Sequence, residues 1–123
     1  MDALLFPPSD DTPGVVYDTQ KDSFTISGRS LPENAIQFYA PVLGWMNNYI
    51  RSPKEISNFT FHFEYVSTSS TKQVMKLMLA IDQLSKSKKV NVYWHYDSGD
   101  SDMLQTGERL EKLTSLKFIY KEV

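Results

Sequence analysis

Five consecutive hydroxyl residues form the stretch of this chain with the clearest capacity for chemistry: Ser67, Thr68, Ser69, Ser70 and Thr71. Hydroxyls placed just before a helix can cap it, by accepting a hydrogen bond from an unpaired backbone amide, or can carry a phosphoryl group. Ser70 and Gln73 have the spacing of a capping box, which predicts that this pair caps the helix. A cap uses one hydroxyl oxygen, so the first three hydroxyls of the run need another explanation.

Phosphorylation is the second possibility for those three hydroxyls. A phosphoryl group would add about −1.5 to −2 charges next to the positive end of a helix, where unpaired amides and the helix dipole favour an anion. Such a modification would act at the surface, as a switch. The residues alone leave both alternatives open, a helix cap and a phosphorylation switch.

The two histidines, His62 and His95, are the other side chains with catalytic potential. A metal site would need partners such as Asp97 or Glu108, and the enzyme alternative that we keep is a small metal-dependent enzyme using His95 and Asp97. The sequence contains no HExxH pair, no G-x-S-x-G elbow and no glycine-rich phosphate loop. We therefore expect no catalytic residue, no metal and no cofactor.

Charged residues further along the chain predict helix ends. The acidic stretch 97–102 indicates a turn followed by a helix, with Asp100 or Asp102 as the N-cap. Three lysines between residues 86 and 89 follow the predicted helix after the hydroxyl run. Cations at that position complement the negative end of the helix dipole, which we favour over a polyanion-binding patch.

Two hydrophobic periods flank the hydroxyl run. Residues 59–65 carry an aromatic side chain at every second position, which predicts a strand with one buried face. Apolar residues then recur at helical spacing: Val74, Leu77, Met78, Ile81 and Leu84. The hydroxyls are therefore predicted to lie at a junction between a strand and a helix.

The remaining elements follow from the same reasoning. A capping box of Ser30 and Glu33 predicts a helix that starts there and reaches residue 50, with a kink or a break at Pro41. Gly107 lies inside another predicted helix, where close packing against a neighbour would explain it. Strands are predicted at residues 4–6, 15–17, 24–27, 55–65, 90–96 and 118–120, the first a short edge strand and the next two a hairpin.

This alternation of strands and helices predicts an α/β fold in which residues 1–123 form a single domain. The net charge of −2 argues against binding to nucleic acid or to anionic membranes. The absence of cysteine excludes disulfides and thiolate chemistry. Neither a signal peptide nor a membrane-spanning run is recognisable, so we expect a soluble, cytoplasmic protein.

Three segments carry a resemblance to a known family: GRSLPENAIQFYAPVLGWMNNYI (28–50), FHFEYVSTSSTKQVMKLM (61–78) and VYWHYDSGDSDMLQTGERL (92–110). In order and spacing they resemble the signature blocks of the SiaC family of bacterial regulatory phosphoproteins. That family resembles the STAS domain of anti-sigma-factor antagonists. The resemblance implies a STAS-like single domain, with a small mixed β-sheet of about five strands packed with about three helices.

The resemblance also implies a function and a site. Thr68 would be the phosphorylated residue, with Ser69 and Ser67 as secondary candidates, and Ser67 stands where the family usually has asparagine. The protein would switch partners without catalysis of its own. A serine/threonine kinase of the anti-sigma type would phosphorylate it, a PP2C-like phosphatase would reverse this, and the unphosphorylated form would bind and activate a diguanylate cyclase, raising cyclic di-GMP and favouring biofilm growth.

A partner surface is predicted at Glu33, Asn34, Tyr39, Asp97 and Asp100. Glu33 and Asn34 match the Pro-Glu-Asn block of the family, and aromatic residues such as Tyr39 are common at binding hot spots. Two further functions stay open. One is a phosphorylation-switched antagonist of an anti-sigma-type kinase in another pathway, and the other is a dimerising scaffold whose edge strands pair.

Overall fold

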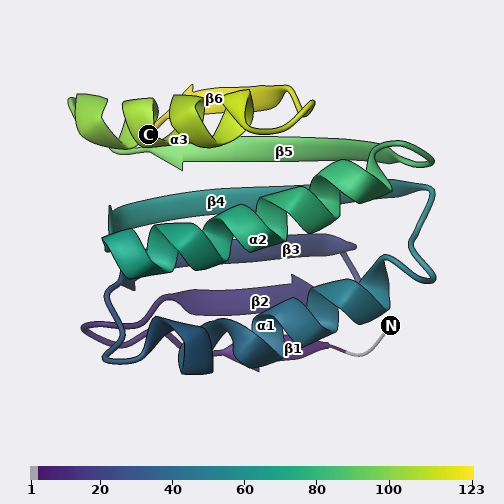
Figure 1. The fold of residues 1–123 in the computed structure, drawn as a ribbon, viewed down its shortest axis with the longest axis horizontal. Coiled ribbons are helices and arrows are strands. Elements are labelled where there is room, and N and C mark those ends of the chain that lie inside the picture. Colours follow the sequence, from purple (N-terminus) through teal and green to yellow (C-terminus); the bar gives the residue numbers. More distant parts are fainter. Residues whose placement is uncertain (1–2) are drawn as a thin grey trace.

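Residues 3–123 are described by the structure, which is a computed structural model of the chain (Figure 1). One sheet contains six strands: β1 (Leu4–Phe6), β2 (Gly14–Asp18), β3 (Ser23–Ser30), β4 (Ile56–Val66), β5 (Lys89–Tyr96) and β6 (Phe118–Glu122). The helices are α1 (Ala35–Tyr49), α2 (Thr68–Leu84) and α3 (Ser101–Lys112). The predicted α/β fold is confirmed, with six strands where the family resemblance implied about five, and β1 is the short edge strand predicted at residues 4–6.

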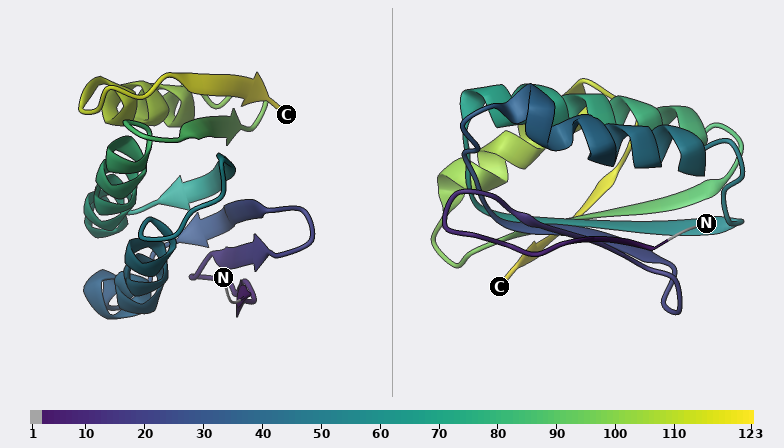
Figure 2. Two further views of the ribbon diagram at one scale, coloured as in Figure 1. Left: turned by 90° about the vertical axis from the view of Figure 1, so that its right-hand side faces the viewer. Right: turned by 90° about the horizontal axis from the view of Figure 1, so that it is seen from below.

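The strands lie in the sheet in the order in which they occur in the chain. β1, β2 and β3 pair antiparallel, which confirms the predicted hairpin, and β3, β4, β5 and β6 pair parallel. Crossovers between parallel strands are almost always right-handed, so three crossovers in the same direction put their helices on the same face. Figure 2 shows all three helices on one face of the sheet, and no helix on the other.

This topology brings the three helix N-termini to one edge of the sheet. Each helix follows a parallel strand, so each begins where β3, β4 or β5 ends (Figure 1). A backbone hydrogen bond of 2.9 Å from Ser67 N to Ser30 O ties the end of β4 to the end of β3. The hydroxyl run therefore lies at the edge where ligands and partners of open α/β sheets commonly bind.

The core lies between the sheet and the helix layer. Phe59, Phe61 and Phe63 of β4 are almost fully buried on the helix-facing side, as their period of two predicts. The predicted apolar face of α2 is buried as well, from Val74 to Leu84. Because each large apolar side chain contributes about 1.5 to 3 kcal/mol on burial, this layer holds α2 against the sheet.

The start of α1 differs from the prediction. Ser30 is the last residue of β3 and is buried, whereas Asn34 is the N-cap of α1, with its side chain accepting a 3.0 Å hydrogen bond from Gln37 N. A break at Pro41 is also wrong, because α1 continues through it. The carbonyl that loses its helical donor belongs to the exposed Gln37, where water can replace the missing bond.

The third helix agrees with the prediction. Asp100 is its N-cap and accepts a 3.0 Å hydrogen bond from Met103 N. Gly107 faces the indole of Trp94, and a Cβ atom there would lie 2.5 Å from Trp94 Nε1. The close packing predicted for this glycine is confirmed. Within residues 3–123 no helix is long and apolar enough to cross a bilayer.

Candidate functional site

The hydroxyl run begins at the N-cap of α2. Ser67 Oγ accepts a 3.1 Å hydrogen bond from Ser70 N, so Ser67 caps the helix and the predicted cap by Ser70 and Gln73 is wrong. The capping-box spacing misled because the chain becomes helical directly after Ser67, three residues earlier than predicted. Asparagine and serine are both preferred N-caps, so a serine in place of the family's asparagine keeps this function.

Ser70 has a different environment from the one predicted. It lies in the first turn of α2, fully buried, and its Oγ is 2.9 Å from Ser30 Oγ and 3.0 Å from Ser67 Oγ. Ser30 Oγ is in turn 2.6 Å from the hydroxyl of Tyr39. These hydroxyls form a buried network that joins β3, α1 and α2, and Gln73 is buried one turn further along α2.

Thr68 and Ser69 are the exposed members of the run. Ser69 Oγ lies 3.3 Å from Ser67 Oγ, and in the described part of the chain the Thr68 hydroxyl makes no hydrogen bond. Thr71, by contrast, donates from Oγ1 to Ser67 O at 2.9 Å. Of the five hydroxyls, the one on Thr68 is both accessible and uncommitted.

The backbone around Thr68 favours an anion. Thr68 and Ser69 occupy the first two positions of α2, and their amides have no acceptor among the described residues. Unpaired amides and the helix dipole together give this end of α2 a positive potential. A phosphoryl group on Thr68 would therefore meet backbone donors that are already in place.

A hollow of about 320 Å³ separates the N-termini of α1 and α2. It is lined by Glu33, Asn34, Ala35, Ile36, Ser69, Lys72 and Gln73. A second hollow, on the outer side of α1, is lined by Glu33, Asn34, Gln37 and Phe38. The predicted partner residues Glu33 and Asn34 therefore line the same hollow as the exposed Ser69, together with Ile36, whose surface is 68% exposed.

Tyr39 does not belong to any surface, contrary to the prediction. Its side chain is fully buried, where its aromatic ring fills the core and its hydroxyl bonds to Ser30. Burial raises the pKa of Tyr39 to about 12, because the interior disfavours the phenolate. The core of a chain of this size is filled by large aromatic side chains, and Tyr39 is one of them.

The carboxylates predicted as partner residues have structural roles. Asp97 Oδ1 is 2.9 Å from His62 Nε2, whereas Asp100 caps α3. The enzyme alternative required Asp97 to work with His95, and Asp97 bonds to His62 instead. Burial lowers the pKa of His95, and the charges of His62 and Lys121 lower it further. Among residues 3–123, no three metal-ligating side chains cluster.

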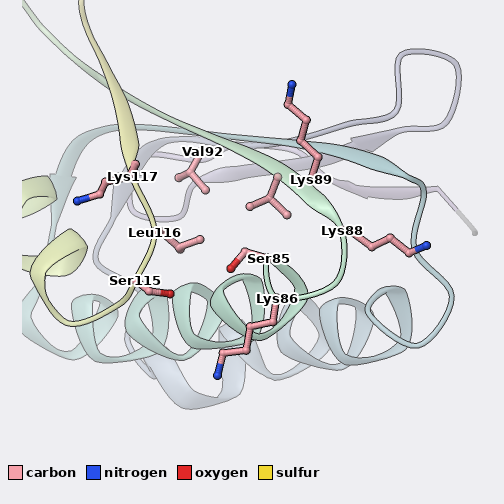
Figure 3. A pocket seen from close by; sticks show the side chains of 9 residues that line it. Ser85, Lys86, Lys88, Lys89, Val92, Ser115, Leu116 and Lys117 are labelled. Atoms are coloured by element: carbon pink, nitrogen blue, oxygen red, sulfur yellow. The ribbon is translucent and has the colours of Figure 1, made fainter.

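A third hollow lies at the opposite end of α2 and was not predicted. Lys86, Lys88, Lys89 and Lys117 surround a floor of Val90, Val92 and Leu116, with a volume of about 460 Å³. Lys88 is paired with Glu55 at 2.7 Å. Figure 3 shows the labelled lysine side chains pointing outward in different directions, so their ammonium groups do not converge on a ligand there.

Fold and site together define a class of protein, a two-layer α/β domain with an exposed threonine hydroxyl at a helix N-terminus. The chain belongs to the SiaC family of regulatory phosphoproteins, which matches residues 6–123. The resemblance found in the sequence is thereby confirmed.

Solved structures from Pseudomonas aeruginosa have the same fold. One structure of SiaC superposes with a TM-score of 0.89 at 22% sequence identity, and the match covers 100% of both chains. A structure of apo-SiaC superposes with a TM-score of 0.88 at 23% identity, and the match covers 98% of this chain and 99% of the other. A chain in the complex of the diguanylate cyclase SiaD with its activator SiaC gives 0.90 at 22%, with the same coverage as apo-SiaC. An uncharacterized protein of P. aeruginosa strain UCBPP-PA14 is 24% identical over 119 residues, which is 96% of this chain and 94% of that protein.

Proposed function

We propose that this protein is a partner-switching regulator without catalysis of its own, controlled by phosphorylation of Thr68. One observation carries the proposal: the Thr68 hydroxyl is exposed and free of hydrogen bonds within residues 3–123, while Ser67, Ser70 and Thr71 are bonded into the helix start. A kinase can reach Thr68 without opening the fold. Membership of a family of regulatory phosphoproteins supports the same reading.

The partners are those that the family resemblance implies. A serine/threonine kinase of the anti-sigma type adds the phosphate, and a PP2C-like phosphatase removes it. The unphosphorylated protein binds and activates a diguanylate cyclase in the cytoplasm, which raises cyclic di-GMP. The structure of SiaC as the activator of the cyclase SiaD, in a protein of the same fold, supports this output.

The phosphate acts on the surface and leaves the fold intact. It adds about −1.5 to −2 charges at a helix end whose free amides can donate hydrogen bonds to the phosphate oxygens, so α2 stays folded. Thr68 is followed at the start of α2 by Ser69, which lines the hollow between α1 and α2 together with Glu33. A partner bound over this end of α2 has to accommodate a dianion, which releases it.

Cyclase activity tests the proposal. A diguanylate cyclase from the same organism is assayed with the wild type, with wild type phosphorylated by the kinase, and with the Thr68→Ala and Thr68→Glu variants. We expect the wild type and Thr68→Ala to activate, and the phosphorylated protein and Thr68→Glu not to. Ser69→Ala is the matched control and should remain switchable. Equal activation by phosphorylated and unphosphorylated protein would overturn the proposal.

A further inference from the structure

The outward face of α2 is a single narrow stripe that begins at Thr68. All the exposed residues of this helix lie on it: Thr68, Ser69, Lys72, Lys76, Leu79 and Gln83. From Ser69 onward they alternate in steps of three and four, which places them along one line of the helix surface. Lys86 continues the same spacing just beyond the helix.

This stripe is basic. Lys72 and Lys76 form no ion pair with any carboxylate in the described residues. The one acidic residue of α2, Asp82, accepts hydrogen bonds from the backbone and side chain of Ser115 and so is already satisfied. Two positive charges without an ion-pair partner among residues 3–123 therefore stand on the solvent face of α2, in a protein whose net charge is −2.

The surroundings leave the stripe accessible. α2 lies between α1 and α3 in the helix layer (Figure 1), and α1 contains no charged residue. Leu79, halfway along the stripe, is 50% exposed. At the far end, the Lys86 side chain points away from the apolar floor of Val92 and Leu116 (Figure 3). Basic side chains on both sides of an exposed leucine form a surface that complements an acidic, amphipathic segment.

We propose that this stripe, from Thr68 to Lys86, is the docking surface for an acidic segment of the protein partner. The inference rests on the proposed function and extends it by naming the surface and the chemistry of the partner. Carboxylates of the segment pair with Lys72 and Lys76, and an apolar side chain covers Leu79. Helical neighbours four residues apart lie close enough to interact, so a phosphate on Thr68 competes for Lys72 and repels the segment.

Charge reversal tests the surface. Affinity for the diguanylate cyclase is measured at two salt concentrations for the wild type, Lys76→Glu and Leu79→Ala, with Lys121→Glu as the matched control. Lys121 is exposed on β6, in register with His95. We expect Lys76→Glu to bind at least about tenfold more weakly and to show a weaker salt dependence than the wild type, because it removes one of the attractive charge pairs that salt screens. The control should stay within about twofold of the wild type.

Two negative results separate the stripe from the switch. If phosphorylated wild type is released while Lys76→Glu and Leu79→Ala bind like the wild type, the stripe is not the docking surface and the proposed function stands. If the wild type does not bind the cyclase, the proposed function fails and this inference fails with it. A second measurement couples lysines to carboxylates with a zero-length carbodiimide. We expect cross-links from Lys72 or Lys76 to the cyclase. Cross-links from Lys121 alone would contradict the proposal.

Discussion

Neighbouring hydroxyls at the start of α2 have different roles because a helix turns by about 100° per residue. Ser67 precedes the helix and bonds to an amide inside it, whereas Ser70 turns inward to Ser30. Thr68 and Ser69 lie between them and face solvent. Five residues of similar chemistry are thereby divided into a structural set and an accessible set by geometry alone.

The cap predicts an asymmetry between two adjacent serines. Ser67→Ala should lower the free energy of unfolding by about 1 kcal/mol, because it removes the acceptor of the Ser70 amide. Ser69→Ala should change it by less than about 0.5 kcal/mol, since its side chain is exposed. Urea unfolding of both variants measures the difference, and equal effects would contradict the assignment of Ser67 as the cap.

The buried hydroxyl of Tyr39 predicts a loss of stability in alkali. Its pKa is about 12 in the folded protein against an ordinary value near 10, so the folded state holds this proton more tightly. Its contribution is complete below about pH 10 and is lost as the pH rises towards 12. The stability difference between the wild type and Tyr39→Phe should therefore shrink over that window in unfolding experiments, and a constant difference would contradict the assignment.

Among the hydroxyl residues, the sequence singled out Thr68, which is exposed, but did not predict the roles of its neighbours. The family resemblance selects Thr68, but the roles of Ser30, Ser70 and Tyr39 depend on contacts between segments far apart in the chain. No local pattern contains such contacts. Ser67 could have been recognised as a candidate cap, because it directly follows the predicted strand. Serine is a preferred N-cap, whose side-chain oxygen accepts a hydrogen bond from the amide two or three residues later.

Helix α3 packs closely against β5. Gly107 meets the indole of Trp94, whose Nε1 donates to Met103 O at 3.0 Å. Glycine permits this approach, since any Cβ atom would overlap the ring. The same indole is thereby held by both a hydrogen bond and a close contact with α3.

Two glycine-to-alanine substitutions should have opposite effects. Gly107→Ala should destabilise by about 1 to 3 kcal/mol because the added methyl group overpacks against Trp94. Gly44→Ala, inside α1 with nothing within 4 Å of its added Cβ, should stabilise by about 0.5 to 1 kcal/mol. Thermal and urea unfolding measure both. A stabilising Gly107→Ala would show that the contact with Trp94 does not exist in solution.

Helices and strands were predicted well wherever the spacing of hydrophobic residues determines their type and bounds. β4, α2 and α3 lie within a few residues of their predicted bounds, because burial of one face fixes both period and length. The errors occurred at α1, whose start was assigned to Ser30 and for which a break was one of the two outcomes expected at Pro41. A serine and a glutamate three residues apart can also occur at the end of a strand, as Ser30 and Glu33 do. A proline at an exposed position of a helix lowers its stability less than a buried one, because water can replace the lost hydrogen bond.

At the scale of the whole molecule, the order of the strands determines where a site can form. Parallel strands joined by crossovers on one face bring the starts of α1 and α2 together, so Glu33 and Ser69 line one hollow although they are far apart in the sequence. The sequence could name Glu33 and Thr68 separately. It could not show that they lie at the same edge, nor that Lys72, Lys76 and Leu79 extend that edge along α2.

The most direct test of the central claim is the location of the phosphate. Protein isolated from its own cells, with its kinase active, is digested and the phosphopeptides are sequenced by tandem mass spectrometry. The account predicts one phosphate, on Thr68, and none on a Thr68→Ala variant isolated in the same way. Phosphate on Ser69 in the wild type, or unchanged phosphorylation of Thr68→Ala, would contradict it.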